Sequence, residues 1–249
     1  MDKMPIDLIS TISPTLNSIQ KTLPELKDKS LFYQDFQFWA IITALFLGII
    51  GIFQENIRRL FQKPKLIPQI HLSPPDCHKI PLTNSATGQR ICDTYYFRFR
   101  VTNEGNTTME DIEVLAAELY EKNPSGRFIK VNNFLPINLV WAHNHVVTMT
   151  KIQPKLFKHC DFGHIIETRY ANLAQFGINS QANIVFVLDT FVQPNTGSNL
   201  ILPGDYKIKI IFSANNVKPK EVWYRLKLED AWDNNEDVMF QNNVSIKKI

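Results

Sequence analysis

The chain has 249 residues, of which 44% are hydrophobic and 20% charged, and its formal net charge is +3. This composition is sufficient for a packed core and excludes a disordered chain. Over residues 66–249, Lys and Arg outnumber Asp and Glu by only 19 to 18. A nucleic-acid-binding surface needs a concentrated basic face, so we expect no nucleic acid among the partners. Three cysteines are too few and too scattered for a disulfide framework, and we expect reduced thiols.

Residues 1–35 predict a short N-terminal tail. Its apolar residues recur at spacings of three and four, which is typical of an amphipathic helix. Pro14 and Pro24 interrupt this pattern and therefore argue against a long coiled coil. We expect a short amphipathic helix that lies on the membrane surface.

Residues 36–54 predict a transmembrane helix. From Phe36 to Phe53 the chain has eighteen residues without a charged side chain. As a helix they span about 27 Å, which matches the hydrocarbon thickness of a bilayer. No polar stripe recurs at each turn, as it would in a helix that packs against a soluble core. The sequence Gln54-Glu55-Asn56 follows in place of a small-residue cleavage site, so we do not expect a signal peptide.

Residues 55–65 predict a basic juxtamembrane helix end and linker, and they indicate the orientation. Four basic residues follow the span, Arg58, Arg59, Lys63 and Lys65, whereas Asp35 lies closest before it. Basic flanks stay on the cytoplasmic side. We expect a single-pass protein of the plasma (inner) membrane, with the N-terminus outside and residues 66–249 in the cytoplasm.

Small residues recur every four positions within the predicted span, at Ala40, Ala44 and Gly48. Small residues at this spacing lie on one helix face and allow two helices to approach closely. They indicate a possible homo-oligomer that forms through the transmembrane helix. The alternative interpretation is that small residues are simply frequent in membrane helices.

Residues 66–249 predict a soluble domain that is mainly β. Residues 96–101 alternate, with Phe97, Phe99 and Val101 on one face and Arg98 and Arg100 on the other. Turn sequences rich in Asn, Gly and Pro separate this stretch from similar ones near residues 112–116, 128–131, 184–188, 206–212 and 222–228. Short strands without long helical patterns between them predict an antiparallel β-sandwich.

Two stretches carry a resemblance to known modules. Residues 98–106, RFRVTNEGN, followed by DIEV at 111–114, resemble the opening of CARDB-like and other immunoglobulin-like bacterial domains. LPGDYKI at residues 202–208 resembles the start of a late strand in the same folds. The resemblance implies an immunoglobulin-like sandwich whose Tyr206 hydroxyl bonds to nearby backbone, as in a tyrosine corner. LVWAH at residues 139–143, HCDFGHI at 159–165 and the segment 232–240 resemble uncharacterised single-pass membrane-anchored bacterial proteins.

Residues 132–180 do not fit a minimal seven-strand module and predict an elaborated insertion. This segment holds the strongest candidates for a metal site, which are His143, His145, His159, Cys160 and His164. If the stretch after Trp141 is a strand, His143 and His145 project to one face, and zinc accepts such mixed ligands. Against a zinc site, the chain has no CxxC or HExxH motif. We therefore favour the alternative, in which Cys160 is buried, Asp161 accepts backbone hydrogen bonds in a turn, and the histidines are half-exposed.

Catalytic motifs are absent from the sequence: there is no GxSxG elbow, P-loop or GxGxxG motif. Cys160 beside His159 and His164 could serve as a thiol nucleophile only if the chain orients these neighbours for proton transfer. We therefore expect no enzyme and no cofactor. A basic sheet face late in the chain, which includes Lys207, Lys209 and Arg225, is interpreted as an ordinary solvated strand face.

The sequence favours a membrane-anchored β-sandwich that acts as an interaction or sensing module for a protein partner at the cytoplasmic face of the membrane. Confinement at a bilayer would raise the effective concentration of whatever the domain binds. One alternative is a membrane-perturbing effector of a toxin-like or antiviral system that oligomerises through its transmembrane helix. Another alternative is a zinc-containing domain or hydrolase.

Overall fold

A computed structural model describes residues 36–61, 63–84 and 86–249 of the chain. The chain divides into two compact units, with the division between Phe61 and Gln62. The amphipathic helix expected within residues 1–35 lies outside the described residues.

The first unit contributes one described helix, α2 (Phe36–Phe61). Its segment Phe36–Gln54 has a mean hydropathy of 2.2 and is long and apolar enough to span a membrane. None of this segment is buried within the protein; for example, Phe46 and Leu47 are each 61% exposed. The helix predicted for residues 36–54 is therefore confirmed, and it continues for two further turns.

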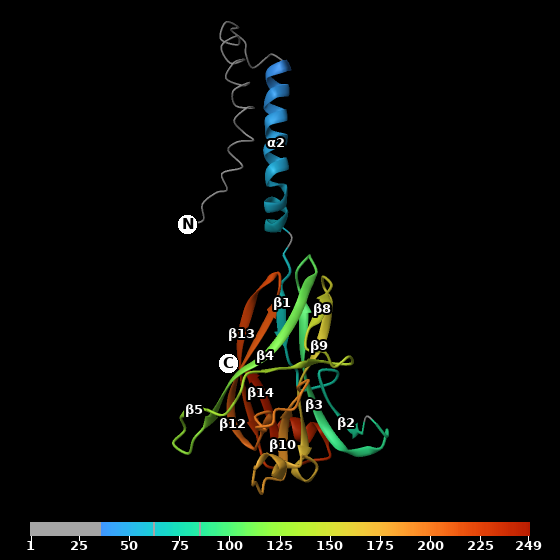
Figure 1. Ribbon diagram of the computed structural model, residues 1–249, viewed down its shortest axis with the longest axis vertical. Helices are drawn as coiled ribbons and strands as arrows, with labels where there is room; N and C mark the ends of the chain where they lie inside the picture. Colours follow the sequence, from blue (N-terminus) through green and yellow to red (C-terminus); the bar gives the residue numbers. More distant parts are fainter. Residues whose placement is uncertain (1–35, 62, 85) are drawn as a thin grey trace. The chain divides into compact units, whose positions relative to one another are not determined.

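The second unit is mainly β and consists of two antiparallel sheets (Figure 1). The first sheet contains β1 (Leu66–Gln69), β2 (Cys77–Thr83), β3 (Arg90–Asn103), β7 (Val140–Trp141), β9 (Phe157–Glu167), β10 (Ile184–Leu188) and β11 (Leu200–Ile201). The second contains β4 (Met109–Lys122), β5 (Phe128–Lys130), β6 (Ile137–Asn138), β8 (Met149–Ile152), β12 (Gly204–Ala214), β13 (Val217–Leu228) and β14 (Val244–Lys248).

Each sheet is organised on one long strand. In the first sheet, β1 and β2 pair in succession along one edge of β3, and β9 pairs along the other edge. In the second sheet, β8, β6 and β5 pair in succession along β4, and β12 and then β13 and β14 follow on its other side. Short 3₁₀ turns at Thr168–Tyr170 and Leu173–Phe176 and short helical turns over Glu236–Val238 and Met239–Asn243 complete the described unit.

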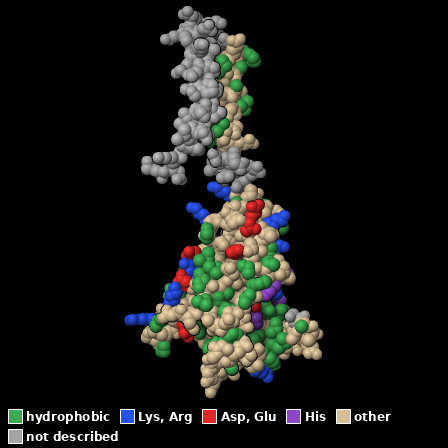
Figure 2. Space-filling model, viewed as in Figure 1, with side chains coloured by type: hydrophobic (Ala, Val, Ile, Leu, Met, Phe, Trp, Pro, Cys, Tyr) green, Lys and Arg blue, Asp and Glu red, His purple; other side chains and the backbone are tan. Residues whose placement is uncertain are grey.

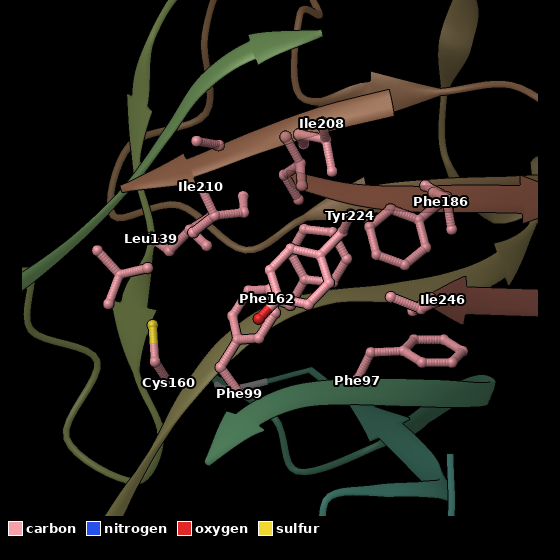
Figure 3. Packing of buried hydrophobic residues seen from close by; sticks show 14 of the residues in the cluster. Phe97, Phe99, Leu139, Cys160, Phe162, Phe186, Ile208, Ile210, Tyr224 and Ile246 are labelled. Carbon is pink, nitrogen blue, oxygen red and sulfur yellow. The ribbon is translucent and has the colours of Figure 1, made fainter. Parts of the chain in front are cut away.

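The core lies between the two sheets and is rich in aromatic side chains (Figure 3). The ring of Phe99 lies 4.7 Å from Phe162, 5.3 Å from Phe212 and 5.1 Å from Tyr224, measured between ring centroids. These rings come from four different strands and are fully buried or nearly so. Aromatic pairs at such separations contribute beyond their buried area, so this cluster holds the two sheets together.

The strands predicted near residues 96–101, 112–116, 128–131, 184–188, 206–212 and 222–228 are confirmed as β3, β4, β5, β10, β12 and β13. The structure differs from the expected insertion at 132–180, because β9 is an interior strand of the first sheet. The Tyr206 hydroxyl also differs from the tyrosine-corner expectation, since its partner is the Glu121 carboxylate, 3.4 Å away.

Candidate functional site

The outer side of β2, β3 and β9 carries an unusual concentration of ionisable side chains, which we call the histidine face. Its strand residues are His78, Tyr96, Arg98, Arg100, His159, Asp161 and His164. The inner side of β3 carries Tyr95, Phe97, Phe99 and Val101, all fully buried. Alternation along β3 therefore places Tyr96, Arg98 and Arg100 on the opposite, outer side. Figure 2 shows histidine side chains gathered on one flank of the sandwich.

A β-bulge in β9 determines which side chains share this face. Phe97 pairs with Gly163 and Arg98 pairs with Asp161, so Phe162 is the additional residue. A bulge displaces the alternation by one position. Asp161 and His164 consequently lie on the same side, although they are three residues apart. A glycine is needed at position 163, since a Cβ there would lie 2.4 Å from the Val187 carbonyl oxygen.

One cluster on this face surrounds Asp76, which precedes β2. The Asp76 side chain is only 1% exposed. The Arg100 guanidinium donates to it through Nε at 3.0 Å and Nη2 at 2.8 Å. His71 Nδ1 lies 2.7 Å from one carboxylate oxygen, and His159 Nε2 lies 3.0 Å from the other. A buried carboxylate with this many donors is well compensated.

The surroundings of Asp76 also determine its protonation. Burial by itself would raise the pKa of this carboxyl, but the bonds from His71, His159 and Arg100 together hold the pKa below its ordinary value. The Asp76 cluster therefore has a permanently ionised centre near neutral pH, and its main role is to fix the loop that leads into β2.

A second cluster forms around Asp161, Asp189 and His164. Arg98 Nε donates to Asp161 at 3.0 Å, and His164 Nδ1 lies 2.8 Å from Asp189 Oδ1. The His164 ring stacks on Tyr96, with 5.1 Å between the ring centroids and 25° between their planes. The other oxygen of Asp189, Oδ2, is buried and has no hydrogen-bond partner among the described residues. This cluster is therefore less completely satisfied than the one around Asp76.

The surroundings of Asp161 in the second cluster change its protonation. Burial raises the pKa of Asp161 to about 6, the negative charge of Asp189 adds to this effect, and Arg98 opposes it. Burial, with Asp189 and Asp161, also raises the pKa of Tyr96, so its hydroxyl stays protonated. Asp161 therefore changes protonation close to physiological pH, which gives the second cluster a chemistry that the first cluster lacks.

The five predicted metal-site residues do not converge. His143 and His145 lie in a turn with left-handed backbone, φ 74° and 52°, so the strand after Trp141 on which a shared face of these two histidines depended is not formed. Cys160 is fully buried in the core, as the alternative interpretation predicts, whereas His159 and His164 lie on the outer face. Within the described parts of the chain, no group of three or more His, Cys, Asp or Glu side chains has a geometry that holds a metal ion.

The thiol hypothesis fares similarly, because Cys160 points away from both histidines. Its Sγ donates to the Val140 carbonyl oxygen at 3.4 Å. Burial raises the pKa of the Cys160 thiol well above its ordinary value and raises the pKa of Cys77 to about 12. A low thiol pKa is what activates a cysteine nucleophile, so neither thiol is activated by its surroundings. Asp161 is also not the turn residue that we expected, since it lies within β9.

The other predicted site residues are placed as follows. Ala40, Ala44 and Gly48 lie in α2, and nothing lies within 4 Å of a Cβ placed on Gly48. Arg58 and Arg59 fall in the last turns of α2, while Lys63 and Lys65 precede β1 and are exposed. Two of the late basic residues are paired with acids: Lys209 pairs with Glu118 and Glu221, and Arg225 pairs with Asp205.

Sequence reasoning missed Asp76, Asp189 and the pairing of Arg98 with Asp161. The alternation around Arg98 and Arg100 did indicate a polar face on β3. Nothing in the sequence indicates that Asp189, which follows β10, reaches His164, because the two are 25 residues apart and the bulge decides the direction of His164.

Two surface hollows share no lining residue with these clusters. One, of about 470 Å³, is lined by Tyr120, Phe128, Lys207, Trp223 and Ile249 on the second sheet. The other, of about 490 Å³, includes Arg90, Asp93, Glu167 and Trp232 among its lining. Both are shallow and open, and neither contains an unpartnered buried acid such as Asp189.

Comparisons of this chain with protein-family models, with curated proteins and with solved structures find no match.

Proposed function

We propose that this protein is a membrane-anchored interaction or sensing module, with α2 in the inner membrane and the sandwich in the cytoplasm, where the histidine face binds a protein partner. The observation that carries the proposal is the second cluster, in which a buried Asp189 oxygen has no hydrogen-bond partner among the described residues and the pKa of the nearby Asp161 carboxyl is raised to about 6. The Asp189 side chain is 13% exposed, and a hydrogen-bond donor of the partner reaches its Oδ2 only when the surrounding side chains move.

The anchor is supported by the exposure of α2. A segment of nineteen mostly apolar residues, none of which is buried within the protein, has to be covered by lipid or by protein. A bilayer can cover this surface without a second protein, because a helix pairs its own backbone polar groups. The basic residues Arg58, Arg59, Lys63 and Lys65 support a cytoplasmic position for the sandwich.

We further propose that the sandwich is immunoglobulin-like. In support of this, the order β1-β3-β9 with β7 beside β9 resembles an A-B-E-D sheet, and β5-β4-β12-β13 resembles the C′-C-F-G sheet. Strands β10 and β11 would then be additions to the first sheet. Modules of this kind commonly serve as binding domains, but the function has to be argued from the site.

The partner is tested by affinity capture of the full-length protein from a detergent extract. We expect the wild-type chain to recover a partner in stoichiometric amount, and Asp189→Asn to recover at least fivefold less of it. Glu229→Gln, an exposed acidic residue outside the face, is the matched control and should behave as wild type. Absence of any stoichiometric partner, or equal recovery with Asp189→Asn, would count against the binding role.

The orientation is tested by protease protection in sealed cells and in inverted vesicles. The sandwich should be degraded only in inverted vesicles, and carbonate extraction should leave the chain in the membrane fraction. Release of the full-length protein by carbonate would refute the proposed membrane anchor. Digestion from outside intact cells would reverse the proposed topology.

The second candidate function is the membrane-perturbing effector, which the exposed stripe of Ala40, Ala44 and Gly48 favours. Helices that associate along such a stripe bring several copies together in the bilayer. Expression of the full-length protein should then depolarise cells, and Gly48→Leu should abolish the effect. High-level expression without depolarisation would argue against it.

A further inference from the structure

One end of the sandwich is fixed to the residues that follow α2 in the chain. Lys63 N donates to the Asn106 side chain at 2.9 Å, and Asn106 N donates back to the Lys63 carbonyl oxygen at 3.2 Å. Glu104 N donates to the Lys65 carbonyl oxygen at 2.8 Å. The chain therefore joins the sandwich at Lys63, with Gln62 alone between it and the last residue of α2, Phe61.

Asn103 connects this end to a second loop. It is fully buried, and its Oδ1 accepts from Lys65 N at 3.2 Å. Its backbone N donates to the Leu156 carbonyl oxygen at 2.9 Å, and its carbonyl oxygen accepts from Lys155 N at 2.7 Å. The loop that precedes β9 is consequently held beside the residues that follow α2.

That loop and the first residues of β9 expose apolar side chains between basic ones. Leu156 is 55% exposed and Phe157 is 44% exposed. Lys155 and Lys158 flank them and are exposed as well. The Arg100 guanidinium lies 4.7 Å from the centre of the Phe157 ring. A pair of exposed apolar side chains between lysines is the composition of segments that enter a lipid interface.

The positive charge of the sandwich is concentrated at this end, which we call the basic end. Seven lysines surround it, while Glu104, Glu110 and Asp111 are its acidic residues. The lysines are Lys63, Lys65, Lys151, Lys155, Lys158, Lys218 and Lys220. The seven lysines and three acidic residues together carry a net charge of +4, whereas residues 63–249 as a whole carry +3. Figure 2 shows Lys and Arg side chains around the upper end of the sandwich.

The lysines at this end also influence one another. Burial lowers the pKa of Lys220, and the positive charges of Lys248 and Lys65 lower it further. Lys220 Nζ lies 3.5 Å from the Leu66 carbonyl oxygen. Like charges repel each other, and an anionic surface relieves that repulsion.

We propose that the basic end docks on an anionic lipid surface, with Leu156 and Phe157 in the interface and the surrounding lysines on the headgroups. The inference rests on the proposed anchor, since α2 brings Lys63 to the bilayer. Lys63 follows Gln54, the last residue of the apolar segment, by nine residues in the chain. This short connection confines the basic end to the neighbourhood of the bilayer surface, where an anionic leaflet attracts lysines.

The test uses the full-length protein reconstituted into vesicles of neutral phosphatidylcholine, with or without 30% phosphatidylserine. An environment-sensitive fluorophore is attached at Leu156→Cys, which is practical because the three native cysteines are buried. We expect the emission of this probe to increase at least twofold with phosphatidylserine. The control probe at Ile129→Cys, which is 56% exposed on β5, should not change.

A charge-reversed variant tests the electrostatic part. Lys155→Glu with Lys158→Glu should abolish the increase at position 156, whereas Arg127→Glu with Lys227→Glu, two exposed basic residues away from this end, should leave it intact. Added salt should weaken the increase, because the lysines are exposed. The inference would be overturned if the emission at position 156 were the same with and without phosphatidylserine. It would also be overturned if the increase persisted in the variant Lys155→Glu with Lys158→Glu.

A third probe at Phe46→Cys separates this inference from the proposed anchor. If the probe in α2 reports lipid while position 156 behaves as Ile129→Cys does, docking of the basic end is refuted and the anchor is retained. If the probe in α2 reports water, the anchor fails and the inference fails with it.

Discussion

Asp161 and His164 lie on the same face of β9 although they are three residues apart, because the bulge at Phe162 displaces the strand alternation by one position. The bulge places Asp161 against Arg98 and places His164 against Tyr96 and Asp189. Without it, one of the two would point into the aromatic core. The second cluster of the histidine face therefore depends on a single additional residue in β9, Phe162.

The first prediction concerns the pH dependence that Asp161 introduces. Its pKa is raised to about 6 in the folded protein, so the folded state binds a proton more tightly than the unfolded state does. The stabilising contribution is present below the ordinary pKa near 4 and is lost as pH rises through about 6. Asp161→Asn should remove this loss, which is on the order of 2 kcal/mol between pH 4 and 7.

The measurement is the unfolding free energy of the full-length protein in mild detergent at several pH values, as the difference between wild type and Asp161→Asn. Glu229→Gln serves as the control, because it changes an exposed carboxyl outside the clusters. A difference that does not vary between pH 4 and 7 would show that Asp161 titrates at its ordinary pKa.

Asp76 should show the opposite pH dependence. The bonds from His71, His159 and Arg100 outweigh burial and lower its pKa, so its contribution is present above the ordinary pKa and is lost as pH falls. Asp76→Asn should lower the unfolding free energy at pH 7 by about 3 kcal/mol, because it leaves Arg100 without its buried partner. This deficit should shrink in acid.

The same unfolding series tests Asp76→Asn, with Asp93→Asn as a control that removes a carboxylate from a more exposed pair with Arg90 and Lys79. The control should lose about 1 kcal/mol or less. If Asp76→Asn is as mild as Asp93→Asn, the Asp76 cluster does not stabilise its loop as the geometry implies.

The sequence allows the elements of this fold to be predicted more readily than their side-chain partners. Alternating stretches such as Phe97, Phe99 and Val101 identify β3 because burial of one face imposes a period of two. The segment around Cys160 is harder, since its bulge breaks that period and hides an interior strand. Asp189 meets His164 only through the pairing of β9 with β10, and long-range pairing of this kind leaves no local pattern.

Two core tyrosines should respond in opposite directions to loss of their hydroxyl group. The Tyr224 hydroxyl is buried and has no hydrogen-bond partner among the described residues, so Tyr224→Phe should leave stability unchanged or raise it by about 1 kcal/mol. The Tyr95 hydroxyl donates to the Asp233 carbonyl oxygen at 2.6 Å. Tyr95→Phe should therefore lower stability by about 1 kcal/mol.

Thermal unfolding of the two variants side by side measures this contrast, because both remove one oxygen from a buried aromatic ring. Equal losses in the two variants would mean that Tyr224 has a partner that the described residues do not provide. A gain in Tyr95→Phe would contradict the bond to Asp233.

The last prediction concerns Asn103, which makes four hydrogen bonds from a fully buried side chain. Its Nδ2 donates to the carbonyl oxygens of Thr107 and Ile152, and its Oδ1 accepts from the backbone N–H groups of Lys65 and Gly105. Asn103→Ala leaves four backbone groups without these partners, two of them in buried bonds, and we expect a loss of about 3 kcal/mol or more in unfolding free energy. Asn103→Asp has a side chain of the same shape but no amide donor, so it retains the two bonds to Oδ1 and loses both donated bonds.

Hydrogen exchange should show the amides of Lys65 and Gly105 becoming less protected in Asn103→Ala and staying protected in Asn103→Asp. If neither variant alters the protection of these two amides, Asn103 does not hold the residues after α2 against the loop before β9. Other contacts must then hold these two segments of the basic end together.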